Sequence, residues 1–326
     1  MSLPESVHAV AAADRHAIPR PSRIAVLMGT FNGSRFLGEQ LASIEAQDLQ
    51  HIDIWASDDG STDETLGMLQ DWQQRWTKGR LNTLSGPRAG FAENYRALIC
   101  NADIDADYYA FSDQDDIWEP QKLSTAMAWF QTKPDNRPLL FGSRTSTMSG
   151  TGHIRGGSPR FQRPPSFRNA LVQSIAGANT MVMNRTARHI LAEASARTGF
   201  VSHDWWAYLV LSGAGGDVCF SPEPLVRYRQ HGGNAVGQNV SVCARLDRLR
   251  RLMAGQFFDW TTANIRGLSL NRDLLTADAW EAFDLFRSSR EGGMITRLRR
   301  LRASGVYRQT AIGTAAIALA TAFRRL

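Results

Sequence analysis

The chain has 326 residues, of which 43% are hydrophobic and 21% are charged, a composition that excludes a disordered or fibrous protein. The net charge is +6, but residues 241–326 carry 15 Arg against 7 acidic residues, which leaves residues 1–240 at −2. This distribution argues against a nucleic-acid binder with basic residues throughout. The basic end indicates an anionic membrane surface or a phosphorylated partner.

Three cysteines, Cys100, Cys219 and Cys243, lie far apart and form no C-x-x-C pair, which argues against a disulfide framework or a Cys-based zinc site. A reducing, cytoplasmic setting is therefore expected. Residues 1–22 lack the layout of a signal peptide and are predicted to form a disordered lead-in. The longest weakly polar run, residues 310–323, is shorter than the roughly 20 residues that span a bilayer, so no transmembrane helix is predicted.

In the first third of the chain, a short β-rich run repeatedly ends in a polar or glycine turn and opens an amphipathic helix, the layout of a parallel α/β sheet. The expected strands are residues 24–28, 52–57, 81–84 and 108–112. The expected helices are residues 36–47, 92–100 and 121–130, with another that starts at a capping box formed by Ser61 and Glu64. Such sheets bind ligands at the carboxyl ends of their strands.

After residue 139 this pattern loosens. Residues 142–165 are rich in Gly, Ser, Arg and Pro and are predicted to form a long mobile loop. Beyond them we expect helices at 185–196 and 203–211, short strands at 218–220 and 225–229, and a turn at 231–234. The remainder is predicted to be an Arg-rich helical tail.

Three carboxylates, Asp113, Asp115 and Asp116, directly follow the buried strand 108–112. They repel one another, and a cation bound at the strand end would relieve this repulsion. Mg²⁺ and Mn²⁺ prefer oxygen ligands, and Mg²⁺ is usually held by one or two carboxylates together with substrate phosphates. A solvated acidic loop is the alternative, and the D-x-D spacing by itself does not decide between them; the position after a buried strand favours a site.

A second acidic pair, Asp58 and Asp59, follows the strand 52–57. A helix cap in an acidic first turn explains such a pair, and by itself this is the better explanation. One cap needs only one of the two side chains, however. The other could accept hydrogen bonds from a base or a ribose, as acidic residues do in nucleotide-binding α/β folds.

Two further side chains carry candidate chemistry. Asp204 stands next to Trp205 and Trp206, and an aromatic, partly desolvated wall raises the pKa of a carboxylate toward that of a general base. His231 precedes two glycines that allow close backbone approach to a diphosphate, and histidine is a common metal ligand. Taken alone, a helix cap beside core tryptophans explains the first residue and a structural role explains the second.

Five segments in this order resemble family-2 glycosyltransferases, inverting enzymes with the GT-A fold that binds nucleotide-diphospho-sugars. They are residues 26–33, 57–63, 111–118, 203–206 and 228–231. The resemblance covers about residues 23–235, and three of its stretches are similar to bacterial rhamnosyltransferase-like members. It implies an α/β fold with a mostly parallel central sheet and a C-terminal helical extension.

The resemblance implies a nucleotide site at the ends of the first strands. Thr30, Phe31 and Asn32 would border the nucleotide, and Asp59 would hydrogen-bond the pyrimidine. Asn94 would lie near the base or the diphosphate. Some members carry a cationic residue in place of Asn94, so less diphosphate charge would be neutralised there.

For the reacting end of the donor, the resemblance implies that Asp113 holds the ribose and that Asp115 binds the Mn²⁺ or Mg²⁺ that bridges the diphosphate. His231 would be a further metal or diphosphate contact. Asp204 would be the base that deprotonates the acceptor hydroxyl. Many members have Glu-Asp where this chain has His203 and Asp204, so the assignment of the base depends on the Asp alone.

The implied activity is a metal-dependent inverting transfer from a nucleotide-diphospho-sugar, with dTDP-L-rhamnose as the expected donor, to a hydroxyl of a bacterial surface polysaccharide or a lipid-linked glycan precursor. The expected organisation is a lead-in at 1–22, a catalytic domain at 23–240 with a donor half (23–118) and an acceptor half (119–240), and an Arg-rich helical region at 241–326. This last region would hold the enzyme peripherally on the inner face of the plasma membrane. Alternatively, it would cover the sheet or pair two subunits in a homodimer. No nucleic-acid partner is expected.

Two other functions compete with this one. A sugar nucleotidyltransferase should carry Lys or Arg in the loop after the first strand, and residues 29–33 have none. A glycan-binding or scaffold protein on a degenerate transferase fold should have lost Asp115, Asp204 or His231, and all three are present. The motifs of P-loop NTPases, nicotinamide enzymes, serine hydrolases and zincins are absent from the sequence, so those classes lose support.

Overall fold

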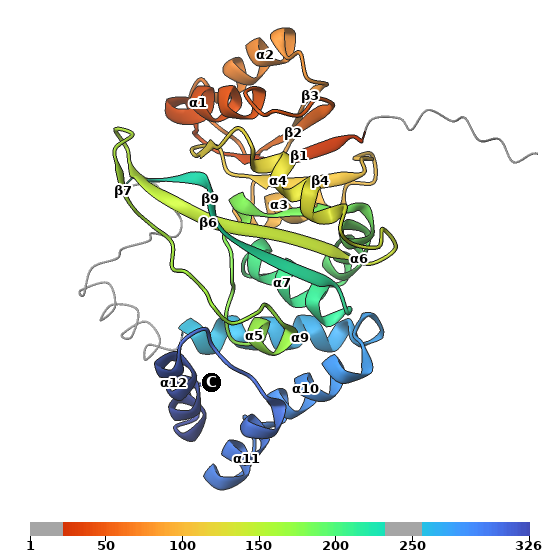
Figure 1. Ribbon diagram of the computed structural model, residues 1–326, viewed down its shortest axis with the longest axis vertical. Helices are drawn as coiled ribbons and strands as arrows, with labels where there is room; N and C mark the ends of the chain where they lie inside the picture. The colour runs from red at the N-terminus through yellow and green to blue at the C-terminus, as the bar shows by residue number, and fades with distance from the viewer. Residues whose placement is uncertain (1–21, 232–255) are drawn as a thin grey trace, which may run out of the picture.

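The computed structural model describes residues 22–231 and 256–326, and its centre is one mixed β-sheet (Figure 1). In the described residues the strand order is β3-β2-β1-β4-β8-β6-β9-β5, with β7 paired to β6. The predicted lead-in falls almost entirely outside the described residues, as does the predicted turn at 231–234 beyond its first residue.

The first half of the chain alternates strands and helices as predicted. The strands are β1 (Ile24–Thr30), β2 (Ile52–Asp58), β3 (Leu81–Ser85) and β4 (Tyr108–Ser112). The helices between them are α1 (Ser34–Glu45), α2 (Thr65–Arg75) and α3 (Phe91–Cys100). These four strands pair in parallel, because each helix returns the chain to the same end of the sheet.

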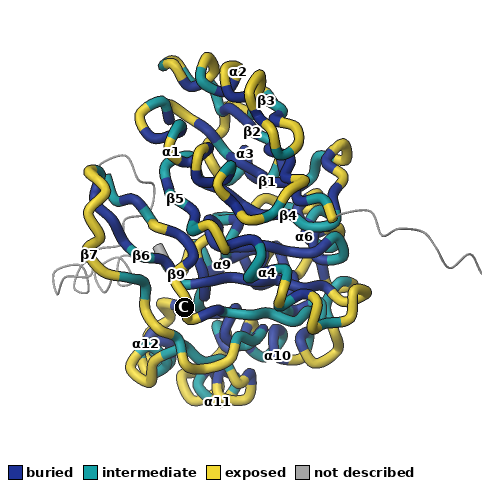
Figure 2. The backbone as a smooth tube through the Cα atoms, turned by 45° about the horizontal axis from the view of Figure 1, so that its top comes forward, coloured by how far each residue is buried: buried dark blue, intermediate teal, exposed yellow. Residues whose placement is uncertain are grey.

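Strand β1 is apolar along its length because both of its faces are covered. Ile24, Val26 and Met28 pack in one hydrophobic cluster with side chains of α1. Ala25 and Leu27 point to the other side and pack in a second cluster with side chains of α3. The strand therefore lies inside the molecule, as the dark central segments of Figure 2 show.

The second half of the sheet is built differently. Its elements are β5 (Ile117–Trp118), α4 (Lys122–Phe130), β6 (Leu139–Ser149), β7 (Ile154–Gly157), α5 (Phe167–Ala170), η1 (Ala178–Thr180), β8 (Val182–Asn184), α6 (Arg185–Arg197), α7 (His203–Gly213) and β9 (Asp217–Gln230). The helices predicted at 185–196 and 203–211 are confirmed. The two short strands predicted at 218–220 and 225–229 are one strand, β9, whose register with β6 shifts around Arg144.

The mobile loop predicted for residues 142–165 is wrong for residues 142–149, which belong to β6, and for residues 154–157, which form β7. Only residues 158–165 are without regular structure beyond the turn between the two strands. β6 pairs with β9 along its whole length. The Gly, Ser and Arg content of this segment is typical of loops, but its backbone groups find partners on a strand that lies some 80 residues further along the chain. Local composition carries no information about such a distant partner.

The capping box predicted at Ser61 and Glu64 is also wrong, since α2 begins only at Thr65. The Ser61 hydroxyl instead donates to Asp58 Oδ2 at 2.6 Å. The N-cap of α2 is Glu64, whose side chain makes no capping hydrogen bond. Asp63 Oδ1 accepts a hydrogen bond from the Thr65 backbone N–H at 3.1 Å. The serine therefore closes the loop after β2 and does not cap the helix.

The C-terminal region is helical, as predicted. Its elements are α9 (Gln256–Leu270), η2 (Arg272–Leu274), α10 (Ala277–Ser288), α11 (Met294–Ser304) and α12 (Ala311–Ala322). Buried side chains of these helices, including Leu268, Phe283 and Ile317, belong to the same hydrophobic cluster as α3 and α7. Within residues 22–231 and 256–326, no helix is long and apolar enough to cross a membrane.

Because Phe283 of α10 is fully buried in this shared cluster, we predict that Phe283→Ala lowers the free energy of unfolding by about 3–5 kcal/mol. Ile312→Ala, at a side chain that is 85% exposed, should change it by less than about 0.5 kcal/mol. Urea unfolding followed by tryptophan fluorescence measures both. Equal, small effects would mean that the C-terminal helices are not part of the cooperative fold.

Candidate active site

Four loops meet at one edge of the sheet because the strands before them run in the same direction. β1, β2 and β4 are parallel neighbours. β8 is antiparallel to β4, β6 is antiparallel to β8, and β9 is parallel to β6, so β9 ends at the same edge as β4. Residues as far apart in the chain as Thr30 and His231 thereby lie at the same carboxyl edge, where open α/β sheets bind their ligands.

Asp115, in the loop after β4, and His231, directly after β9, meet across this edge. Nε2 of His231 lies 2.7 Å from Oδ2 of Asp115, although the two residues are 116 positions apart. Both side chains keep some exposure, 22% for His231 and 15% for Asp115. The histidine ring also packs against Phe36 of α1, with 4.9 Å between the ring centroids. The fold thus brings together the two residues expected to contact a metal.

The three carboxylates after β4, Asp113, Asp115 and Asp116, form what we call the aspartate cluster. Asp113 is the member nearest to α3, where its Oδ1 lies 3.1 Å from the Tyr95 hydroxyl. That hydroxyl also donates to the carbonyl of Ser112 at 2.6 Å. Burial, followed by the charge of Asp115, raises the pKa of Asp113 to about 7. A cation or a hydrogen-bond donor beside Asp113 would therefore be favourable.

Asp116 has no exposed surface, and its carboxylate connects the loop after β4 to β9 and to η1. Its Oδ1 accepts a hydrogen bond from the backbone N–H of Arg229 in β9 at 3.0 Å. Its Oδ2 accepts another from the side-chain amide of Asn179 in η1 at 2.5 Å. Burial raises the pKa of Asp116 well above its ordinary value. The residue therefore fixes the end of β9 relative to the loop after β4.

Two buried cationic side chains lie close to the aspartate cluster. The Arg229 guanidinium donates from Nε to the carbonyl of Asp115 at 2.9 Å and from Nη2 to Glu39 of α1 at 2.8 Å. Lys122 is fully buried at the start of α4, with its Nζ 3.1 Å from the centre of the Trp118 ring. Burial lowers the pKa of Lys122, while the charges of Asp116 and Asp113 oppose this effect.

Asp204 lies in the first turn of α7, as the sequence indicated. Its Oδ1 accepts a hydrogen bond from the Ser202 hydroxyl, and its Oδ2 accepts another from the Ser174 hydroxyl at 3.4 Å. Burial raises the pKa of Asp204, and its charge in turn raises the pKa of Asp113. A carboxylate with a raised pKa near the aspartate cluster is suited to proton transfer.

His203 connects α7 to α3 and β4. Its ring stacks on Tyr95, with 3.7 Å between centroids, and meets the edge of Phe111 at 5.0 Å. Among the described residues, neither of its ring nitrogens has a hydrogen-bond partner. Burial lowers the pKa of His203 to about 3, so the ring is neutral. Because Tyr95 also contacts Asp113, this stack fixes α7, and with it Asp204, relative to the aspartate cluster.

The loop after β1 is held by a glutamine that the sequence analysis missed. Gln114 pairs with the backbone of Phe31 through two hydrogen bonds, of 2.8 and 2.9 Å. Thr30 is buried and donates to Asp58, whereas the Phe31 side chain is 55% exposed at the sheet edge. Asn32 adopts a φ of 47° and accepts a hydrogen bond from the Thr62 backbone. Gln114 was detectable as the middle residue of the D-x-D turn.

The helix cap expected from the acidic pair is not formed, because α2 begins only at Thr65 and neither Asp58 nor Asp59 caps it. Asp58 closes its own loop, because its Oδ1 accepts from the backbone N–H groups of Gly60 and Ser61. Asp59 accepts hydrogen bonds from the backbone of Arg88 and Gly90 at 2.6 and 2.8 Å. A carboxylate has about four acceptor positions, so Asp59 retains acceptor capacity for a ligand.

Asn94 is 2% exposed and lies on the inner face of α3. Its side-chain amide forms two hydrogen bonds with Ser57 of β2. Oδ1 accepts from the Ser57 hydroxyl at 2.5 Å, and Nδ2 donates to the Ser57 carbonyl at 2.8 Å. In the described structure Asn94 therefore fastens α3 to the sheet. The neighbouring Tyr95, which does reach the aspartate cluster, was missed because a tyrosine in an amphipathic helix looks like any core residue.

The donor set at this edge fits a divalent cation that is shared with a substrate. Asp115 and His231 offer one carboxylate and one imidazole, both of which are ligands for divalent cations. In the part of the chain that the structure describes, no group of three or more potential ligands surrounds one position. A cation held by these two side chains would leave positions for substrate phosphates and water, as is usual for Mg²⁺.

Comparison with known proteins gives the family. Residues 25–189 match glycosyl transferase family 2. The chain is 29% identical over 229 residues to the dTDP-rhamnosyl transferase RfbG of Shigella flexneri, a match that covers 68% of this chain and 78% of that protein. A shorter match, 32% identical over 94 residues, joins it to the succinoglycan biosynthesis protein ExoW of Rhizobium meliloti and covers 28% of each chain.

The fold is similar to that of TarS residues 1–349 from S. aureus, whose structure was solved in complex with UDP-GlcNAc. The TM-score is 0.53 and the sequence identity is 14%, with 91% of each chain covered. This likeness supports the GT-A architecture. The family match identifies a glycosyltransferase, in place of the nucleotidyltransferase and scaffold alternatives.

The buried neutral His203 makes a pH-dependent contribution to stability. Its pKa is about 3 in the folded protein and about 6.5 when exposed, so the unfolded chain binds one more proton between these values. Stability is therefore lost as the pH falls below about 6.5. We predict that His203→Phe, which keeps an aromatic ring, reduces the loss between about pH 6.5 and pH 5.5 by about 1 kcal/mol.

Urea unfolding at several pH values measures this difference. His189→Phe, at an exposed histidine of α6, is the matched control and should leave the pH dependence unchanged. The same pH dependence in wild type and His203→Phe would contradict the burial of a neutral imidazole.

Proposed function

The chain belongs to glycosyl transferase family 2, and we propose that it catalyses a metal-dependent, inverting transfer of a sugar from a nucleotide-diphospho-sugar to a hydroxyl of a bacterial surface polysaccharide or a lipid-linked glycan precursor. The observation that carries this proposal is the contact between Asp115 and His231 at the carboxyl edge of the sheet. A D-x-D carboxylate and a distant histidine converge there on one position.

The proposed donor is dTDP-L-rhamnose, with the donor half in residues 23–118. The 29% identity to a dTDP-rhamnosyl transferase over most of both chains supports this choice. Asp59 keeps acceptor capacity for a pyrimidine, and the exposed Phe31 ring is suited to stack on a base. Asp113 would accept a hydrogen bond from the ribose. Thr30 and Asn32 would border the nucleotide and hold the loop after β1 through their hydrogen bonds. Asn94 would lie near the nucleotide and position the end of β2 through its hydrogen bonds with Ser57.

Asp115 and His231 would hold Mn²⁺ or Mg²⁺ together with the diphosphate of the donor. When bound, the metal supplies positive charge that stabilises the nucleoside diphosphate as it leaves. Neighbouring residues keep both ligands in place. Arg229 donates a hydrogen bond to the carbonyl of Asp115, and Asp116 accepts one from the backbone N–H of Arg229. The ligands are therefore positioned before the donor arrives.

Asp204 would act as the general base. It would remove the proton from the acceptor hydroxyl as the hydroxyl oxygen bonds to the anomeric carbon, while the bond from that carbon to the diphosphate oxygen breaks. One attack on the opposite face inverts the anomeric centre, as in single-displacement glycosidases. The raised pKa of Asp204 supports this role, because a stronger base takes the proton more readily.

We also propose a cytoplasmic enzyme that works peripherally on the inner face of the plasma membrane, with the acceptor half in residues 119–240. Cys100 and Cys219 are free thiols, which supports a reducing compartment. Nucleotide sugars are the expected small-molecule partners, and a nucleic acid is not among the proposed ones.

If Asp115 holds the metal, calorimetry should show dTDP binding that depends on Mn²⁺ in wild type and loses this dependence in Asp115→Asn. UDP and GDP titrated in parallel test the choice of nucleotide, with dTDP expected to bind more tightly. Asp71→Asn, at an exposed carboxylate of α2, controls for the loss of one charge. Unchanged metal-dependent binding in Asp115→Asn would refute the metal site, and stronger binding of another diphosphate would refute the donor.

For the base, we predict that Asp204→Asn lowers kcat by about 10²–10⁴-fold while donor affinity stays near the wild-type value. The carboxylate is needed only when the acceptor proton is removed, so replacing it lowers kcat and not the affinity for the donor. Transfer from dTDP-rhamnose to a lipid-linked acceptor measures kcat, and circular dichroism checks the fold. Near-native turnover by a folded Asp204→Asn protein would make the assignment wrong.

A further inference from the structure

Helix α12 has an apolar face that nothing in the described residues covers. The helix contains no charged residue from Ala311 to Ala322. Ile317, Ala320 and Thr321 are buried against the rest of the fold, while Ile312 and Leu319 are 85% and 61% exposed. A helix that is apolar all around is normally buried on all sides, so the open side of α12 requires a partner.

The exposed positions form one continuous stripe. Ile312, Ala315, Leu319 and Phe323 follow one another at spacings of three and four residues, which places them on one face of the helix. Met294 and Ile295, at the start of α11, add two more exposed apolar side chains. Of the eleven large apolar side chains exposed in the described structure, five lie between residues 294 and 323. We call Met294, Ile295, Ile312, Leu319 and Phe323 the C-terminal apolar face.

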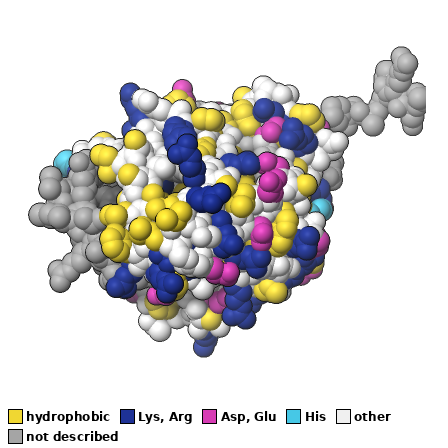
Figure 3. All heavy atoms as spheres, turned by 90° about the horizontal axis from the view of Figure 1, so that it is seen from below, with side chains coloured by type: hydrophobic (Ala, Val, Ile, Leu, Met, Phe, Trp, Pro, Cys, Tyr) yellow, Lys and Arg dark blue, Asp and Glu magenta, His cyan; other side chains and the backbone are white. Residues whose placement is uncertain are grey.

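Arginines accompany the C-terminal apolar face. Residues 292–326 carry seven arginines and no acidic residue. Four of these arginines are exposed: Arg299, Arg302, Arg324 and Arg325. Figure 3, which views the molecule from the side of α11 and α12, shows hydrophobic side chains gathered on part of this face with Lys and Arg side chains beside them. Apolar and cationic groups therefore share one surface.

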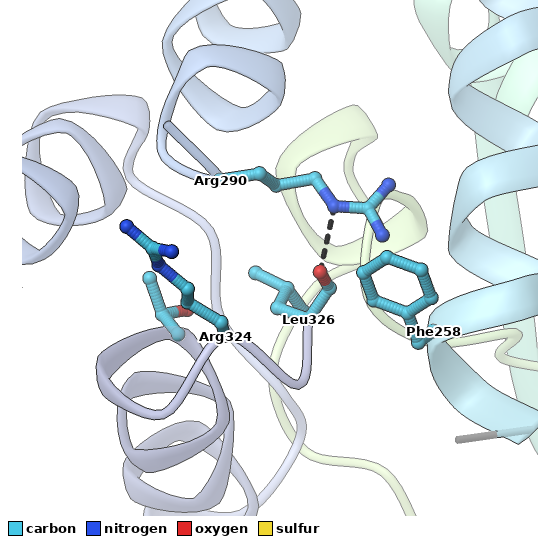
Figure 4. Close-up of a pocket in the computed structure, with 5 residues that line it drawn as sticks. Phe258, Arg290, Arg324 and Leu326 are labelled. Atoms are coloured by element: carbon cyan, nitrogen blue, oxygen red, sulfur yellow. Dashed lines mark hydrogen bonds between the residues drawn. The ribbon is translucent and has the colours of Figure 1, made fainter. Parts of the chain in front are cut away.

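A cavity of about 230 Å³ opens next to the end of α12, lined by Phe258, Arg290, Thr321, Arg324 and Leu326. Figure 4 shows the Arg290 side chain reaching toward Leu326, whose carbonyl accepts a hydrogen bond from Nε at 2.6 Å. The guanidinium also lies 4.1 Å from the centre of the Phe258 ring. Arg290 is thus paired within the protein, whereas Arg324, the other arginine of the lining, is exposed.

We propose that α12 and the start of α11 dock on the surface of an anionic lipid bilayer. The apolar stripe enters the interface, and the arginines engage lipid phosphates beside it, the arrangement of interfacial amphipathic helices. Twelve residues span only about 18 Å, less than the roughly 30 Å hydrocarbon core, so α12 lies in the interface and does not cross it. In Figure 1, β6 and β9 end at the upper left of the molecule, and α12 lies at its lower left.

The test uses the full-length protein and sedimentation with vesicles, without donor or acceptor, so its outcome is independent of the proposed transfer reaction. We expect binding to vesicles of phosphatidylcholine mixed with phosphatidylglycerol, weakening as salt rises, and at least about tenfold weaker partitioning to phosphatidylcholine alone. Ile312→Ser/Leu319→Ser should lower partitioning to the anionic vesicles by at least about tenfold. Arg302→Glu/Arg325→Glu should do the same.

Matched controls come from α2 and from Arg80, the residue before β3, at the opposite end of the molecule (Figure 1). Leu66→Ser removes one exposed apolar side chain, and Arg75→Glu/Arg80→Glu reverses two exposed arginines with the same change in net charge. Both controls should bind vesicles like wild type. Wild type that stays in the supernatant, or controls that lose binding as much as the α11 and α12 variants, would overturn the proposal. So would a dimer in analytical ultracentrifugation that the Ile312/Leu319 variant abolishes, because a second copy would then cover the face.

Discussion

The repulsion among three carboxylates at the end of β4 is the constraint on which the rest of the site depends. Asp113, Asp115 and Asp116 stand within four residues, at the edge of a buried strand, where the dielectric is low and like charges interact strongly. Burial first, and this repulsion second, raises the pKa values of Asp113 and Asp116. A fold that holds these groups together must surround them with compensating donors and cations.

The second half of the chain supplies that compensation. β9 brings the Arg229 backbone to Asp116 and the Arg229 guanidinium to the carbonyl of Asp115. The same strand then delivers His231 to Asp115. Strand β9 thus supplies structural support for the cluster and, directly after its end, one of the two proposed metal ligands, His231. A proposed metal would complete a charge balance that the protein has met only in part.

The position of the proposed base, Asp204, relative to the aspartate cluster is set by aromatic packing of the preceding residue. His203, at the start of α7, is a neutral ring stacked on Tyr95, whose hydroxyl reaches Asp113. Asp204 is the next residue, so its distance from the aspartate cluster is set by an aromatic contact. Because its ring is neutral, His203 adds no further charge beside the proposed base.

The sequence alone determined the first half of the fold and the identity of most candidate residues, because apolar periodicity, strand-end turns and acidic motifs are local signals. Strands β1 to β4 and the D-x-D turn fall close to where the pattern put them. Only the tertiary structure decided the course of residues 142–165, the roles of Tyr95 and Gln114, and the contact between Asp115 and His231. Each of these depends on pairing between segments far apart in the chain, and local composition does not specify which distant strand or side chain satisfies a given backbone group or charge.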